Sequence, residues 1–339
     1  MSQTSIQILI DQIEQVARDT DFSGVVSIHQ VHSPLYQQAF GYRDIQNQIP
    51  NLPGTRFGIA SGTKFFTALG IGRLIDQGLL TLETQVGELS TDYAGFIDPH
   101  ATIRHLLTHT SGIYDYFDEE IEQDFDNFFV SIPWYGLETP SDYWPLFQRQ
   151  VAKFQPGERF SYSNGGYIFL GLLIEKISGQ LFRDFMREQV FQVANMPRTG
   201  FYALNKLPAN TALGHLEDRQ TTNIYNLPIR GGGDGGLFTT ADDLCSFWQH
   251  LFAHRILSPE LTAVFLRTHE RFDENTGYGC GLYKRLDDSL FAIVGGDAGV
   301  GFDSRYLVNQ KITASILSNT TNGEESLRKV VLDFFDKEA

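Results

Sequence analysis

The sequence FGIASGTKFF, residues 57–66, contains the tetrad Ser61-Gly62-Thr63-Lys64 directly before an apolar, helix-forming stretch. We expect a helix over residues 65–76 that stops at Gly78, because glycine commonly follows the last turn of a helix. Positions i and i+3 share one helix face, with Cβ atoms about 5–6 Å apart, so the Lys64 amine can reach the Ser61 hydroxyl. The helix dipole also favours negative charge that develops near Ser61. The tetrad therefore predicts an activated serine at a helix N-terminus.

The same spacing recurs at Ser326-Leu327-Arg328-Lys329, so the tetrad alone does not identify an activated serine. This second copy lies among charged residues of a predicted amphipathic helix (residues 324–336), and we interpret it as a solvated helix face.

A second candidate group is Tyr162-Ser163-Asn164, the only Tyr-x-Asn in a chain with 14 tyrosines. It directly precedes a predicted helix at residues 167–177. It fits either a catalytic tyrosine or a loop tyrosine followed by a capping asparagine.

Composition limits the class of protein. A chain of 339 residues exceeds the usual size of one compact domain, which predicts two lobes. A formal net charge of -15 disfavours binding to nucleic acid and to anionic membranes. We find no apolar run of the ~20 residues that cross a bilayer, and no secretory signal in the first 20 residues. These features, with only Cys245 and Cys280 as thiols, predict a cytoplasmic protein.

The order of predicted elements indicates an α+β fold, with an antiparallel sheet flanked by helices and built from both ends of the chain. A mainly helical lobe is inserted between these ends. We expect residues 1–70 and 220–339 to form the sheet lobe and residues 71–219 the helical lobe, with the active site between them. This expectation rests on a predicted helix at 6–18 and on predicted strands at 25–29, 36–41, 281–285, 290–294, 305–308 and 313–317. The first two strands are expected to form a hairpin across Ser33-Pro34.

Several further motifs follow the tetrad in order: QGLLTL at 77–82, IRHLLTHTSG at 103–112, FQPGE at 154–158 and FSYSNGGY at 160–167. Together they resemble the serine β-lactamase and penicillin-binding protein superfamily, specifically its class C-like branch. That branch includes class C β-lactamases, D-alanyl-D-alanine carboxypeptidases, D-aminopeptidases and esterases. The resemblance covers residues 22–201, with a weaker match at GGLFTTADDL (235–244).

The resemblance implies that Ser61 attacks a carbonyl and forms an acyl-enzyme that water hydrolyses. Lys64 and Tyr162 would exchange the serine proton, and an adjacent ammonium is expected to lower the pKa of the tyrosine. Asn164 would bind the substrate amide or Lys64, and the backbone N–H of Ser61 would donate to the oxyanion. The family mechanism implies no metal and no organic cofactor.

The third motif of the branch, Lys-Thr-Gly or His-x-Gly, is altered here. The chain has GGDAGVGF at 295–302, with Gly296 in place of the basic residue. A backbone N–H from this strand could still donate to the oxyanion, and we expect Asp297, Ala298 and Gly299 to bind substrate. The missing cation would hold a substrate carboxylate, which both penicillins and D-alanyl-D-alanine peptides carry.

The resemblance thus predicts a serine hydrolase that acts on a small ester or on an amide or peptide. A β-lactamase, a D-alanyl-D-alanine carboxypeptidase or a D-aminopeptidase is an alternative. An alternative of another class is a catalytically silent, ligand-binding family member. Neither a nucleic-acid partner nor a membrane span is expected.

Three other features each have a structural and a functional interpretation. His100, His105 and His109 have metal-like spacing, but the family pattern makes His105 and His109 structural. The Gly231 to Gly236 run lacks the Gly-Lys-Ser/Thr ending of a phosphate loop and predicts a flexible loop. Acidic residues are frequent at positions 115–126. They form either a solvated surface or a pocket wall that selects an amine-bearing or neutral substrate.

Overall fold

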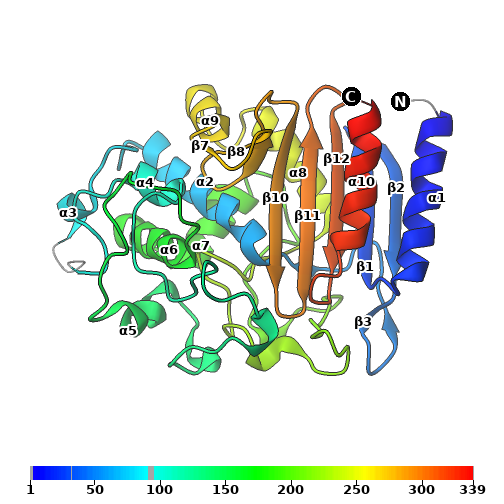
Figure 1. The fold of residues 1–339 in the computed structure, drawn as a ribbon, viewed down its shortest axis with the longest axis horizontal. Helices are drawn as coiled ribbons and strands as arrows, with labels where there is room; N and C mark the ends of the chain where they lie inside the picture. Colours follow the sequence, from blue (N-terminus) through cyan, green and yellow to red (C-terminus); the bar gives the residue numbers. More distant parts are fainter. Residues whose placement is uncertain (1–2, 32, 91–94, 339) are drawn as a thin grey trace.

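Eight antiparallel strands form the main sheet of the computed structural model, which describes residues 3–31, 33–90 and 95–338 (Figure 1). In spatial order the strands are β2 (Ser33–Phe40), β1 (Gly24–Gln30), β12 (Ile312–Ser318), β11 (Val300–Leu307), β10 (Leu290–Asp297), β9 (Tyr283–Arg285), β8 (Thr276–Tyr278) and β7 (Glu270–Arg271). The N-terminal strand β1 pairs with the C-terminal strand β12, with Gly24 opposite Ser318. The expectation of an antiparallel sheet built from both chain ends is confirmed.

Helices cover both faces of this sheet. α1 (Gln3–Asp19) and α10 (Glu325–Glu338) lie side by side over one face, and α8 (Ala241–Phe252) lies over the other (Figure 1). Because both faces are covered, β12 is buried along its whole length.

The first helix packs through one apolar stripe. Leu9, Ile13 and Ala17 follow one another at intervals of four residues, so they share one face of α1, and all three are buried. They belong to the same apolar cluster as three residues of α10, Leu327, Val331 and Phe335.

The remaining α-helices lie on the β7–β10 side of the sheet, away from β2 (Figure 1). They are α2 (Thr63–Asp76), α3 (Val86–Leu89), α4 (Ile103–Leu107), α5 (Trp144–Phe147), α6 (Asn164–Ser178), α7 (Phe182–Met186) and α9 (Pro259–Leu266). α2 is buried along almost its entire length and packs against α6. The predicted lobe boundary at residue 70 falls inside α2, and the division into lobes at 71 and 220 stays a prediction.

Two short strand pairs lie outside the main sheet, one between neighbouring segments and one between distant parts of the chain. β3 (Tyr42–Asp44) pairs with β4 (Ile49–Pro50), and β5 (Phe57–Gly58) pairs with β6 (Phe238–Thr239). The second pair brings the residues before Ser61 next to the residues that follow the glycine-rich run.

The structure differs from the expected elements in a few places. The β1–β2 turn comes before Ser33 and Pro34, which both pair with β1, so the predicted turn at these two residues is wrong. Residue 32 lies outside the described residues. The strands β7 and β8 and the helix α9 were not predicted. Within the described ranges, no helix combines the length and the apolar content that a membrane crossing needs.

Replacement of Ile13 by alanine is expected to destabilise the protein by about 2–5 kcal/mol, because its fully buried side chain would leave a cavity under α1. The matched control is Ile8→Ala on the same helix, where the side chain is 51% exposed and the expected change is about 0.5 kcal/mol or less. Chemical denaturation of the two variants and the wild type measures both values. Equal losses of stability would contradict the assigned packing face of α1.

Candidate active site

Ser61 lies in a one-turn 3-10 helix, Ala60–Gly62, that continues directly into α2. Ala60 has a φ of +43°, a left-handed conformation that is costly for a residue with a side chain. Strand β10 runs very close to this turn. A Cβ atom on Gly295 would lie 2.3 Å from the Ile59 carbonyl oxygen and 2.8 Å from the Ser61 nitrogen. Only glycine at 295 allows this strand to touch the backbone of Ser61.

The Lys64 amine is buried and contacts Ser61 as the spacing predicted. Its Nζ donates to Ser61 Oγ at 2.9 Å, to Asn164 Oδ1 at 2.7 Å and to the main-chain oxygen of Asp234 at 2.9 Å. Three acceptors satisfy the three N–H groups of an ammonium. The side chain is 1% exposed, so these acceptors replace water completely.

Tyr162 lies beside the same amine, with Lys64 Nζ 4.8 Å from the centre of its ring. The ring also packs on His109, at 4.4 Å between centroids. The expected lowering of the tyrosine pKa is wrong in direction. Burial, with the negative charge of Glu119, raises the pKa of Tyr162 well above its usual value, while a hydrogen bond with Ser61 acts the other way.

Asn164 is the first residue of α6, and Ser163, not Asn164, caps this helix by accepting from Gly166 N. The Asn164 amide faces the site. Its Oδ1 accepts from Lys64, and its Nδ2 donates to the Phe117 carbonyl oxygen at 2.8 Å and to Glu119 Oε1 at 3.0 Å. Asn164 thus joins the lysine to the acidic segment.

The acidic segment is partly structural and partly in the site. The buried Asp115 accepts from the main-chain N–H groups of Asn164 and Gly165 at 2.8 and 2.7 Å, where the positive end of the α6 dipole favours a carboxylate. This contact holds the segment against the start of α6, so part of it forms an inner wall and not only a solvated surface.

Both sequence neighbours of Glu119 form ion pairs. Asp118 pairs with Lys153 at 2.6 Å, and Glu120 pairs with Arg159 at 2.6 Å. Glu119 itself accepts from Asn164 Nδ2 and lines the cavity beside Ser61.

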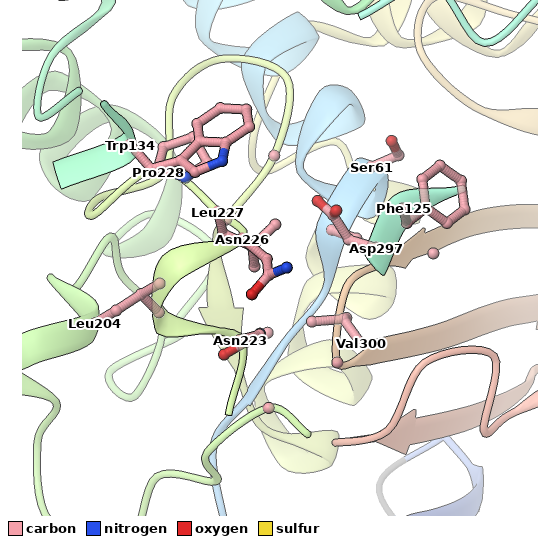
Figure 2. A pocket seen from close by; sticks show the side chains of 18 of the residues that line it. Ser61, Phe125, Trp134, Leu204, Asn223, Asn226, Leu227, Pro228, Asp297 and Val300 are labelled. Atoms are coloured by element: carbon pink, nitrogen blue, oxygen red, sulfur yellow. The ribbon is translucent and has the colours of Figure 1, made fainter. Parts of the chain in front are cut away.

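A cavity of about 260 Å³ opens beside Ser61 (Figure 2). Its carboxylates are Glu119, Asp234 and Asp297, and among the described residues that line it there is no lysine, arginine or histidine. The side opposite Ser61 is mostly apolar, as Figure 2 shows for Trp134, Leu204, Leu227 and Pro228. The cavity therefore combines acidic residues with an apolar wall.

The third motif contributes unequally to this cavity. Asp297, Gly299 and Gly296 line it, but Ala298 does not: it is fully buried, and its carbonyl accepts from Asn223 Nδ2 at 2.8 Å. The Gly299 N–H is occupied by Thr321 Oγ1 at 2.8 Å. Burial, with the nearby charges of Asp234 and Glu119, raises the pKa of Asp297 to about 7.

The glycine run 231–236 is a packed part of the site, so its interpretation as a flexible loop is wrong. Thr67 Oγ1 donates to the Gly233 carbonyl at 2.7 Å, and a Cβ atom on Gly233 would lie 2.1 Å from the Tyr167 carbonyl oxygen. The run passes between α2 and α6 and places Asp234 at Lys64. Sequence reasoning missed Asp234, although a single carboxylate amid five glycines was a possible signal.

The histidine cluster and the second tetrad have structural explanations. His105 Nδ1 accepts from Thr102 N at 3.1 Å in a capping box of α4, and His109 Nδ1 accepts from Ser163 N at 3.0 Å. The described residues contain no cluster of His, Cys, Asp and Glu suited to a metal ion. Ser326 and Lys329 are exposed on α10.

A family model described as Beta-lactamase matches residues 10–332, nearly the whole chain. The chain belongs to the Beta-lactamase family. Penicillin-binding protein 4* of Bacillus subtilis (strain 168) is 29% identical to it over an alignment of 347 positions, which covers 96% of this chain and 74% of that protein. Two other curated relatives are longer, and this chain spans 64% and 58% of their lengths.

Solved structures of this family have the same fold. A penicillin binding protein from Bacillus halodurans is 37% identical, with a TM-score of 0.89 over 95% of this chain and 99% of that one. The D-amino acid amidase from Ochrobactrum anthropi SV3, complexed with D-phenylalanine, has a TM-score of 0.78 at 22% identity, over 99% of each chain; this likeness concerns the fold alone. The resemblance found in the sequence, and the fold that it implied, are confirmed. Membership in the family indicates a serine hydrolase in general.

Gly233→Ala is expected to lower both stability and any Ser61-dependent reaction, because the added Cβ would displace the run that carries Asp234. Gly136→Ala is the matched control, since a Cβ atom there meets nothing within 4 Å. Thermal melting and the rate of Ser61 labelling by a fluorophosphonate measure the two effects. A Gly233→Ala variant that behaves like Gly136→Ala would refute the close contact with α6.

Proposed function

We propose that this chain is a serine hydrolase that forms an acyl-enzyme on Ser61 from a small ester or a small amide or peptide. The observation that carries the proposal is the hydrogen bond from Lys64 Nζ to Ser61 Oγ, 2.9 Å long, at the edge of a substrate-sized cavity. A catalytically silent member would have no use for a buried amine on an accessible serine.

In the proposed first step, Ser61 Oγ attacks the substrate carbonyl and its proton moves to Lys64 in the neutral amine form. Burial lowers the pKa of Lys64, which makes the neutral amine more accessible than in water, whereas the pKa of Tyr162 is raised. The lowered pKa of Lys64 and the raised pKa of Tyr162 favour neutral Lys64 over a Tyr162 phenolate as the proton acceptor. Tyr162 would then pass a proton to the leaving group.

The developing oxyanion needs N–H donors at the acyl carbon. The N–H of Ser61 lies at the start of α2, and strand β10 supplies a second candidate donor close to it. In the described sheet, β9 pairs with β10 only at Phe291 and Ala292, and beyond this pairing Gly296 and Asp297 line the cavity.

The charge of the cavity supports a neutral or positively charged substrate. Three carboxylates and no described basic side chain would repel the carboxylate of a penicillin or of a D-alanyl-D-alanine peptide. The altered third motif supports the same choice, since Gly296 supplies no cation. The apolar wall fits an aliphatic or aromatic substituent.

A second candidate function is hydrolysis of an amide that carries a free amine, as a D-aminopeptidase or an amidase would perform. The favouring observation is Glu119, a carboxylate that lines the cavity while its neighbours pair with Lys153 and Arg159. An ammonium beside Glu119 and Asp297 would be attracted rather than repelled.

Treatment with a fluorophosphonate is expected to label the wild type and not Ser61→Ala. Lys64→Met should label at least about 10²-fold more slowly, the lower end of what a positioned proton acceptor contributes. Ser326→Ala is the matched control, because it removes the serine of the exposed second tetrad and should label normally. Labelling is measured by mass spectrometry and gel fluorescence. A wild-type protein that stays unlabelled would contradict the proposal.

Among p-nitrophenyl esters of equal chain length, the neutral ester is expected to react faster than one with a terminal carboxylate, because the cavity wall is negative. Glu119→Gln and Asp297→Asn should each narrow the difference in kcat/KM, by about tenfold or less. Steady-state hydrolysis with each ester measures the ratio. Preference for the anionic ester, or efficient labelling by a fluorescent penicillin, would instead favour the β-lactamase or carboxypeptidase alternative.

A further inference from the structure

Asp234 is the one acceptor of Lys64 whose side chain is an acid in the cavity wall. Its main-chain oxygen accepts from Lys64 Nζ at 2.9 Å, and the residue itself lines the cavity beside Ser61. Lys64 and Tyr162, by contrast, are not among the residues that line this cavity. Asp234 therefore connects the space for substrate with the amine behind Ser61.

The Asp234 carboxylate, like its main chain, is held by contacts within the protein. The residue is 7% exposed, and Tyr116 Oη donates to its Oδ2 at 2.5 Å. Tyr116 is in turn packed edge-on against the buried Tyr143, with 5.3 Å between ring centroids. A short hydrogen bond from a hydroxyl to a buried carboxylate favours the charged form of that carboxylate.

The backbone of the glycine run leaves Asp234 little freedom. Gly233 is anchored by Thr67 and has no room for a Cβ atom beside α6, as described for the site. A Cβ atom on Gly231 would lie 2.5 Å from the Gly235 carbonyl oxygen, so the run also packs on itself. Asp234 is thus fixed on both sides.

Groups from every surrounding element face Lys64. They are Ser61 from the helix start, Asn164 and Tyr167 from α6, Tyr162 and His109 from the adjoining segments, Asp115 and Glu119 from the acidic segment, Asp234 from the glycine run and Asp297 from β10. Of these, the four carboxylates favour the ammonium form. Burial lowers the pKa of Lys64, and Asp234 is the strongest opposing influence, ahead of Glu119.

We propose that Asp234 is a positioning residue of the reaction: its carbonyl holds the Lys64 amine against Ser61, and its carboxylate, held by Tyr116, stabilises the ammonium form. The inference rests on the proposed function, in which Ser61 must lose its proton to neutral Lys64. Lys64 first releases one proton to solvent and then takes the Ser61 proton, so the protons balance. The Asp234 charge thereby sets the pH above which Ser61 becomes reactive.

The sign of the effect follows from this charge. The labelling rate rises with pH as Lys64 loses its proton. Removal of a nearby negative charge makes the ammonium less stable, so the rise moves to lower pH. Removal of the Tyr116 hydroxyl takes away a hydrogen bond that favours the charged Asp234 carboxylate, so the rise also moves to lower pH, by less than when the carboxylate itself is removed.

The test measures the rate of fluorophosphonate labelling of Ser61 against pH in the full chain. In Asp234→Asn the midpoint of the rise is expected to fall by about one pH unit or more, the lower end of the effect of a close opposite charge. Tyr116→Phe should show a smaller fall of the midpoint, because its carboxylate is still present but loses the hydrogen bond that favours the charged form. Asp333→Asn, an exposed acid on α10, removes the same charge far from the site and should match the wild type.

The outcomes test the proposed function and the inference about Asp234 separately. An unlabelled wild type would refute the proposed function. A labelled wild type with the same midpoint in Asp234→Asn, or with no dependence on pH, would overturn only the inference about Asp234. If Asp234→Asn does not fold by circular dichroism, Tyr116→Phe carries the test. A midpoint that stays where it is or rises in this variant overturns the inference, because the Tyr116 hydrogen bond favours the charged carboxylate.

Discussion

The buried amine of Lys64 is the constraint on which the arrangement around Ser61 depends. An ammonium that is 1% exposed has lost its water and must find acceptors and opposite charge within the protein. The acceptors come from three parts of the chain, the helix start, α6 and the glycine run. Each of these parts has to be placed within hydrogen-bonding distance of one nitrogen, which fixes the relative positions of α2, α6 and residues 231–236.

The same need for opposite charge accounts for the acidic character of the cavity. Asp234, Glu119, Asp115 and Asp297 all act on Lys64, which is the lone cation among the described groups that meet there. Three of these acids, Glu119, Asp234 and Asp297, also line the cavity, so the substrate meets an excess of negative charge. The acids that select the substrate therefore also stabilise the charge of Lys64, the group that activates the serine.

Local patterns in the sequence predicted the elements that local forces determine. The helix after Ser61 and the helix predicted at residues 167–177, which is α6, both follow from periodicity and from helix stop signals. The short strands β7 and β8 have too few residues to show an alternating pattern, which is why they were missed. The β1–β2 turn was misplaced because Pro34 suggests a turn, although edge strands such as β2 tolerate proline.

The parts of the site that escaped prediction are those that tertiary packing brings together. Asp234 reaches Lys64 across 170 positions of sequence, and nothing near residue 234 reveals that contact. Ala298 was expected in the cavity because its neighbours are there, but a tight turn points successive residues in different directions. The reversed pKa shift of Tyr162 has the same origin, since burial and the charge of Glu119 depend on the folded environment.

The pairing of β1 with β12 has a consequence for how the protein is made. A chain emerging from the ribosome exposes Ser61 well before the strand that lies against Ser61 and the partner of β1, which follow much later in the sequence. Such distant pairings impose a high contact order and slow folding. The nascent chain therefore carries its serine in an unassembled state until β10 and β12 have been synthesised.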